Sequence, residues 1–166
     1  KQHIILVTAH GQSLRFNEEE ARPMAWATKG VRGIKLLEGD HVVAMEVARD
    51  DAQLLVVTEN GYGKKSLIDE YRLTHRGSKG VKGLNVTEKN GSLISISKVQ
   101  DDSDLIIITN SGIVIRIPLD QVSKMSRVTQ GVRLINLKED QKVATVSLSK
   151  QENSEEETQP NTSEQE

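Results

Sequence analysis

The chain of 166 residues has no cysteine, so it has no disulfide, no thiolate metal site and no cysteine nucleophile. It has only four aromatic residues, one Phe, one Trp and two Tyr. That number is too small for the stacking platforms of single-strand nucleic-acid binders. The longest apolar runs, such as 54–57 and 105–108, span about four residues, whereas a membrane helix needs roughly 20. The composition therefore predicts a protein that does not cross a membrane, and any nucleic-acid contact should be to phosphates.

The charges divide the chain into two parts. Residues 1–150 contain 22 Lys and Arg against 18 Asp and Glu, a net charge of +4. Residues 151–166 contain six Glu and neither Lys nor Arg. Because this acidic tail has no apolar side chain to anchor it, we expect it to be disordered. The whole-chain charge of −2 thus conceals a basic body.

Three units of similar sequence follow one another at intervals of 50 and then 51 residues. Each unit opens with an apolar run that ends in a threonine and is followed by a glycine turn, at Thr8, Thr58 and Thr109. A second signature has its glycine 22 residues after each threonine. It occurs as KGVR, KGVK and QGVR at 29–32, 79–82 and 130–133. Such self-similarity is typical of repeat architectures.

The pattern inside each unit predicts β-strands. Apolar, β-branched runs bounded by Gly, Asn and Asp favour strands and tight turns. A break at 17–20, 68–71 and 119–122 predicts one short helical turn in each unit. Each unit is therefore predicted to be a four-stranded antiparallel blade, with boundaries near 4–50, 54–100 and 105–149. Blades repeating at this period predict an all-β, propeller-like array over residues 1–150, and three blades form an open or partial ring.

The repeat resembles the blade of the β-pinwheel, the C-terminal domain found in gyrase A of DNA gyrase and in its topoisomerase IV relatives. The third unit carries the resemblance most fully, with TNSG at 109–112, IRIP at 115–118 and TQGVRLI at 129–135. The resemblance covers residues 4–148. The family's domain has six blades, so the chain looks like its C-terminal half. The Gln-Arg-Arg-Gly-Gly-Arg-Gly box of the first gyrase blade is absent and is expected upstream of Lys1.

The resemblance implies a non-catalytic module that binds double-stranded DNA by its phosphate backbone and bends or wraps it. It implies that the parent is an ATP-dependent type IIA topoisomerase, DNA gyrase, which supercoils DNA. The catalytic tyrosine would lie upstream in gyrase A, and ATP hydrolysis would belong to gyrase B. The expected partners are DNA, the rest of gyrase A and gyrase B, in the bacterial cytoplasm at the nucleoid. No cofactor or metal is expected.

Basic residues recur beside the second signature of each unit and are the candidate DNA-binding residues. The recurring cations are Lys29, Arg32, Lys35, Arg76, Lys79, Lys82, Arg127, Arg133 and Lys138. Lys64 and Lys65, after the second turn, are expected to add to them. The alternative is a solvated charged face without a ligand. The glycines among these cations either let backbone approach a phosphate or serve strand crossings, and we favour the structural role.

Other interpretations of the sequence remain open. The chain is also compatible with a topoisomerase IV C-terminal domain that directs the choice of DNA substrate, or with a propeller-like module that docks a protein partner. Residues 61–66 do not match a nucleotide-binding loop, because Lys65 stands where that loop has Ser or Thr. The four histidines have no metal-ligand spacing. Trp26, the only tryptophan, is expected to pack in the interior between blades.

The charge division generates a first prediction. A tethered segment of charge −6 competes with DNA for basic residues at high effective concentration. The chain ending at residue 150 should therefore bind duplex DNA more tightly than the whole chain at about 50 mM salt, where charge interactions are weakly screened. Fluorescence anisotropy with a labelled duplex measures both affinities. Equal affinities would reject the hypothesis of autoinhibition by the tail.

Overall fold

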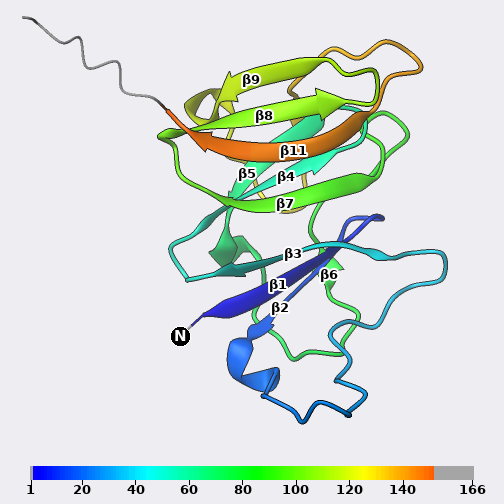
Figure 1. Cartoon of the computed structure of the whole chain (residues 1–166), viewed down its shortest axis with the longest axis vertical. Coiled ribbons are helices and arrows are strands. Elements are labelled where there is room, and N and C mark those ends of the chain that lie inside the picture. Colours follow the sequence, from blue (N-terminus) through cyan, green and yellow to red (C-terminus); the bar gives the residue numbers. More distant parts are fainter. Residues whose placement is uncertain (1, 152–166) are drawn as a thin grey trace, which may run out of the picture.

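The computed structural model describes residues 2–151, which form three antiparallel β-sheets that follow one another along the longest axis (Figure 1). The sheets have four, four and three strands. The first sheet contains β1 (His3–Thr8), β2 (Gln12–Asn17), β3 (Val42–Ala48) and β6 (Val81–Lys82). The second contains β4 (Gln53–Thr58), β5 (Tyr62–Leu67), β7 (Leu93–Val99) and β10 (Val132–Arg133). The third contains β8 (Ser103–Thr109), β9 (Val114–Pro118) and β11 (Val143–Lys150).

The outer strand of a sheet comes from the following repeat unit. β6 of the second unit pairs with β2 of the first, placing Lys82 opposite Gln12. β10 of the third unit pairs with β5 of the second, placing Arg133 opposite Tyr62. The expectation of four antiparallel strands is thus met in two sheets, but not by four strands of one unit. The third sheet has three strands because no fourth unit supplies another within the described residues.

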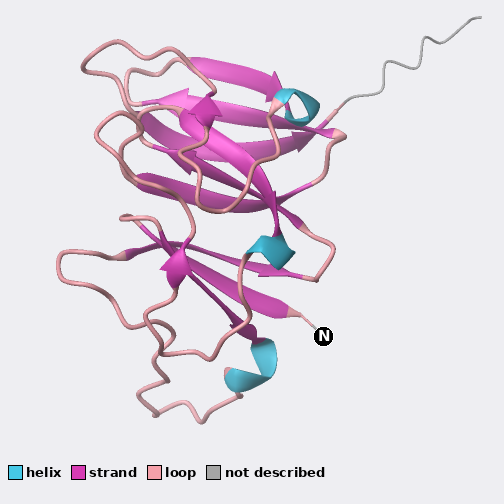
Figure 2. Cartoon of the chain, turned by 180° about the vertical axis from the view of Figure 1, so that it is seen from behind, coloured by secondary structure: helices cyan, strands magenta, loops and turns pink. Residues whose placement is uncertain are grey.

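One short 3₁₀ helix follows the second strand of each unit, as the sequence predicts. These are η1 (Glu18–Glu20), η2 (Ile68–Glu70) and η3 (Leu119–Gln121). The Asn17 side chain caps η1 by accepting a hydrogen bond from the Glu19 backbone N–H at 3.0 Å. Ile68 and Leu119 open the other two and are fully buried. All three turns lie along one side of the molecule (Figure 2).

The hydrophobic core lies between the sheets, and β4 contributes to it from both faces. Because side chains alternate along a strand, Leu54 and Val56 pack toward the first sheet. Leu55 and Val57 pack on the opposite side, against the third sheet. The four-residue apolar run of β4 is therefore buried on both sides, at no more than 1% exposure. One apolar cluster thus lies on each face of β4, and a third, smaller cluster contains Leu14, Phe16 and Ile34.

We call β6 and β10 the swapped strands, because each pairs with the preceding unit. Where the chain crosses to that unit, the two backbones lie close together. Gly80, beside β6, has φ +76°, and a Cβ there would lie 2.2 Å from the Ser13 carbonyl oxygen. Gly131, the equivalent residue beside β10, has φ +81° and faces the Gly63 carbonyl in the same way. These contacts support the structural interpretation of the motif glycines.

The two crossings fill the same space with different side chains. At the first, Gly83 packs against Ser13, and a Cβ on Gly83 would lie 2.8 Å from the Ser13 side chain. At the second, Leu134 replaces the glycine and the residue opposite is Gly63. A Cβ on Gly63 would lie 2.6 Å from the Leu134 side chain. The larger side chain in one partner is thus matched by a missing side chain in the other.

Gly30 and Gly80 provide a matched test of this crossing. Both have φ +76°, but nothing lies within 4 Å of a Cβ on Gly30. Gly30→Ala should cost about 1–2 kcal/mol, the strain of the left-handed conformation. Gly80→Ala should cost roughly 1–3 kcal/mol more, because the backbone at Ser13 must move. Urea unfolding measures both, and equal costs would contradict the close crossing.

Candidate functional site

The candidate surface follows the swapped strands, and we call it the rim. Seven of the recurring cations are exposed, and six of them make up the rim: Lys29, Arg32, Lys35, Lys79, Lys82 and Arg133. The seventh, Lys138, lies in the loop before β11. Lys82 and Arg133 lie in β6 and β10, the outermost strands of their sheets. Lys79 shortly precedes β6. None of these six forms an ion pair with a carboxylate within the described part of the chain. Their charges therefore face solvent.

The first unit presents its three cations differently. Lys29, Arg32 and Lys35 lie in the segment 21–41, which contains no strand. The equivalent residues of the second and third units pair with the sheet of the preceding unit, but the first unit has no preceding sheet among the described residues. The cations are therefore exposed without the ladder that orders β6 and β10.

Two other predicted cations, Arg76 and Arg127, tie neighbouring units together. The Arg76 guanidinium donates to the carbonyls of Glu20 and Arg32 in the first unit, at 3.0 and 3.2 Å. Arg127 stands 51 residues later and donates to the equivalent carbonyls of Glu70 and Lys82. Both side chains are half-buried. Their charge adds to the potential of the rim, but most of their donors serve the junctions.

The sequence predicts Lys64 on the rim, but this expectation is wrong because the side chain is fully buried. Its ammonium donates to the carbonyls of Ser126, Arg127 and Thr129 at 2.8, 2.5 and 3.1 Å. These residues belong to the third unit, so the side chain fastens the second unit to the third. Burial, together with the nearby charge of Arg127, lowers the pKa of Lys64 to about 8, while Glu70 acts in the opposite direction. Lys64 has no surface for a ligand.

The expectation for Lys65 is also wrong, for a related reason. Its side chain is buried, and its ammonium donates to the Leu119 carbonyl and to the Asp101 carboxylate, at 2.5 and 2.7 Å. The hydrogen bond to Asp101 lowers the pKa of that carboxyl group. Arg15 makes the equivalent contacts one unit earlier, with the Ile68 carbonyl and Asp50. Each cation thus reaches the helical turn and linker of the next unit.

Trp26 does not pack in the interior as the sequence predicts, because its side chain is fully exposed. It occupies the position in the first unit that Arg76 and Arg127 occupy in the second and third. Those arginines contact the preceding unit, whereas no described residue precedes the first unit in that place. The side chain therefore has no neighbouring unit to pack against among residues 2–151.

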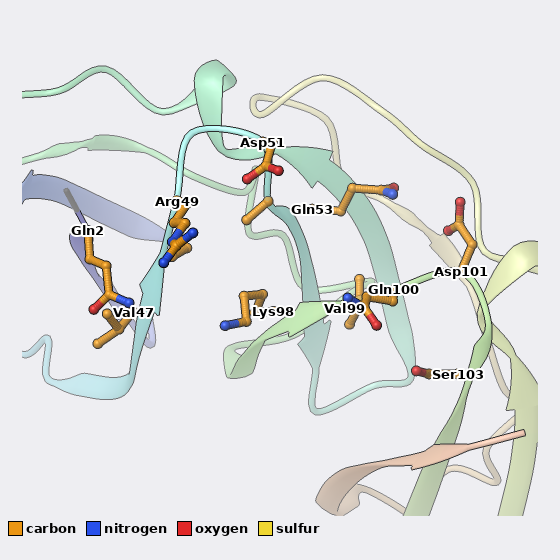
Figure 3. A pocket seen from close by; sticks show the side chains of 12 residues that line it. Gln2, Val47, Arg49, Asp51, Gln53, Lys98, Val99, Gln100, Asp101 and Ser103 are labelled. Carbon is orange, nitrogen blue, oxygen red and sulfur yellow. The ribbon is translucent and has the colours of Figure 1, made fainter.

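Two hollows adjoin the described surface. The larger, of about 570 Å³, lies where β3 and β7, the strands that end their sheets opposite β6 and β10, meet the linkers between units (Figure 3). Arg49 and Lys98 line it together with Asp51 and Asp101, so its charges balance. The smaller, of about 280 Å³, adjoins Arg133 and includes Lys89 and Lys142, two cations outside the recurring set. Their loops differ between units, so the repeat pattern does not reveal them.

Residues 2–151 contain no group of three His, Asp or Glu side chains arranged to hold a metal ion. They also contain no helix with the length and apolar character that a membrane crossing requires.

Comparison with known proteins relates the chain to the C-terminal domain of gyrase A. The family described as "DNA gyrase C-terminal domain, beta-propeller" matches three times, at residues 2–49, 52–100 and 103–150. These ranges coincide with the three repeat units. Gyrase A of the DNA gyrase from Staphylococcus aureus strain MRSA252 is 44% identical over 158 residues, which is 94% of this chain and 18% of that protein. The chain thus spans about a fifth of this curated relative.

Two solved structures share the fold. The C-terminal domain of a DNA topoisomerase IV superimposes with a TM-score of 0.82 and 25% identity, covering 90% of this chain and 47% of that one. A DNA gyrase A C-terminal domain superimposes with a TM-score of 0.81 and 26% identity, covering 89% and 50%. The chain corresponds to about half of each domain.

The buried ammonium of Lys64 predicts how stability varies with pH. Lys64→Met should lower the free energy of unfolding by roughly 1–3 kcal/mol at pH 7, since three carbonyls lose a donor. The unfolded chain holds the lysine proton up to a pKa near 10.5, but the folded chain releases it near 8. The contribution of Lys64 to the free energy of unfolding should therefore rise between these pH values. Over that range, the free energy of unfolding of the wild type should increase relative to that of Lys64→Met.

Urea unfolding at intervals from about pH 7 to 10 measures this difference. Lys98→Met is the matched control, because Lys98 is exposed on β7. A difference between wild type and Lys64→Met that stays constant with pH would contradict the shifted pKa.

Proposed function

The chain belongs to the family of DNA gyrase C-terminal β-propeller domains, and we propose that it is a non-catalytic module that binds duplex DNA along the rim and bends it. The observation that carries the proposal is the recurrence of exposed cations, free of ion pairs within residues 2–151, at the swapped strand of successive units. Lys79 and Lys82 stand at one junction, and Arg133 stands at the next. A ligand that contacts all of them must be long, anionic and repetitive.

Duplex DNA has these properties. Its phosphates present one negative charge per ~1.7 Å of helix axis, and cations that neutralise them release counterions. The few aromatic residues fit contact with phosphates rather than stacking on bases. Bending a site of about 20–30 bp by 40–90° costs roughly 1–6 kcal/mol, so contacts at several units are needed to offset it. The recurrence of cations by unit supplies such contacts.

In the parent protein, this module supports supercoiling by DNA gyrase, an ATP-dependent type IIA topoisomerase. Its partners there are the remainder of gyrase A and gyrase B, and its location is the cytoplasm of a bacterium, at the nucleoid. The relationship to gyrase A of Staphylococcus aureus supports this proposal. The cleavage chemistry lies outside residues 1–166 in this proposal.

A topoisomerase IV C-terminal domain that directs the choice of DNA substrate is the second candidate. The TM-score of 0.82 with such a domain favours it as much as the 0.81 with the gyrase domain. The identity of 44% with a gyrase A protein weighs for gyrase. A propeller-like module that docks a protein partner is the remaining alternative, and its binding would not depend on DNA phosphates.

Charge reversal on the rim tests the proposal. Arg32→Glu, Lys79→Glu and Arg133→Glu, combined, should weaken duplex binding at least about tenfold at 0.1 M salt, because each change replaces an attraction to phosphate by a repulsion. The matched control combines Arg49→Glu, Lys98→Glu and Lys150→Glu, which are exposed and lie on or next to β3, β7 and β11, at the sheet edges opposite β6, β10 and β9. Fluorescence anisotropy between about 50 and 200 mM salt measures the affinity and its salt dependence.

The outcomes separate a DNA-binding rim from a module that docks a protein partner. Loss of affinity in the rim variant alone, with a log-linear decrease of wild-type binding with salt, supports a DNA-binding rim. Equal binding by the rim variant and the control, or absence of duplex binding by the wild type, would reject it. Circular dichroism and urea unfolding of both variants establish that they remain folded.

A further inference from the structure

The smaller hollow lies at the junction of the second and third units, next to the rim. Its walls are the turn between β4 and β5, the loop before β7 and the loop before β11. Four cations line it, against the single carboxylate of Glu139. The cations are Lys89, Arg133, Lys138 and Lys142. Three uncharged amides, from Asn60, Asn136 and Gln141, lie among them. The hollow is therefore strongly positive and rich in hydrogen-bond donors.

Two of the cations are held by neutral groups. The Arg133 guanidinium donates to the Tyr62 hydroxyl at 3.0 and 3.3 Å and to the Asn136 side-chain oxygen at 3.2 Å. The Lys142 ammonium donates to the Asn60 side-chain oxygen at 2.5 Å. Within residues 2–151, none of the four cations forms an ion pair. Arg133 and Lys142 are thus fixed in position, yet no carboxylate neutralises their charge.

The Tyr62 ring is the anchor of this arrangement. It is 7% exposed, and its centroid lies 5.6 Å from the Arg133 guanidinium and 5.8 Å from the Lys89 ammonium. Both are cation–π distances, at which the ring face attracts positive charge. One side chain thus holds two cations near each other, and an anion between them would offset their mutual repulsion.

The first junction lacks this arrangement. The register of the repeats places Gln12 where Tyr62 stands, Thr87 where Lys138 stands and Ser92 where Lys142 stands. Lys82 is the equivalent of Arg133. It is the one cation among Gln12, Lys82, Thr87 and Ser92. The larger hollow at the linkers has charges of both signs. Among these places, the second junction has the clear surplus of positive charge.

We propose that this hollow binds one phosphate group of the DNA backbone, so that the path of the duplex continues from Arg133 off the rim and over the second junction. The inference rests on the proposed function. A phosphate accepts several hydrogen bonds at once, and an arginine and ammonium groups are its usual partners. A volume of about 280 Å³ has room for one phosphodiester with parts of its sugars.

The test removes two charges of the hollow that lie outside the rim. Lys89→Gln and Lys142→Gln, combined, should lower the magnitude of the log–log salt slope of duplex binding by about 0.9, the value for one phosphate contact. The affinity should then fall about eightfold at 0.1 M salt, which follows from that slope. Lys98→Gln with Lys150→Gln is the matched control, since it removes the same charge from β7 and β11, at residues that do not line the hollow. Lys89→Arg with Lys142→Arg should retain the wild-type slope.

A titration with inorganic phosphate distinguishes a DNA contact from a site for free phosphate. We expect phosphate to shift the amide NMR signals of Asn60 and Asn136 in the wild type and not in the double glutamine variant. Unchanged duplex binding in that variant overturns the proposal, and a phosphate response alongside it assigns the hollow to free phosphate instead. If the rim variant loses DNA binding while this variant does not, only the present proposal fails. A wild type that binds no duplex overturns both.

Discussion

The swapped outer strand is the constraint on which the rest of the structure depends. β6 completes the sheet of the first unit and β10 that of the second, although each belongs to the unit that follows. Backbone hydrogen bonds are obligatory for a buried strand, so a unit with its own strands alone leaves an edge unpaired. Folding of one unit is therefore coupled to folding of the next. The signature cations lie on or beside these strands, so the same feature that joins the units also places positive charge on the outside.

The junctions explain why basic residues are poor guides to a surface in this chain. Arg15 and Lys65 extend forward to the helical turn of the next unit, and Arg76 and Arg127 extend back to carbonyls of the preceding one. These side chains supply donors to backbone carbonyls of the short helical turns, where no sheet ladder is available. Long cationic side chains suit this role because several donors sit at the end of a flexible stem. The chain thus divides its cations between holding units together and facing solvent.

Much of this fold is encoded in local patterns of sequence. The repeat period, the longer strands, the glycine turns and the helical turns all follow from spacing and residue type. The swap does not, because β6 and β10 have two residues each, too few for alternation to indicate a partner. The burial of Lys64 also escapes sequence reasoning, since lysine is rarely buried and its three acceptors lie more than 60 residues away. The exposure of Trp26 also escapes sequence reasoning, because its burial would need a preceding unit and none is among the described residues.

The exchange of side-chain size at the crossings has a consequence for the order of the units. Gly83 fits against Ser13, and Leu134 fits against Gly63. If the third unit followed the first directly, Leu134 would meet Ser13, where a single added Cβ already has no room. If the second unit followed itself, Gly83 would face Gly63 and leave a void. The second unit therefore fits after the first, and the third fits after the second. Side-chain size at the crossings, and not only the chain order, determines which units can be neighbours, so units placed in another order would not pack in the same way.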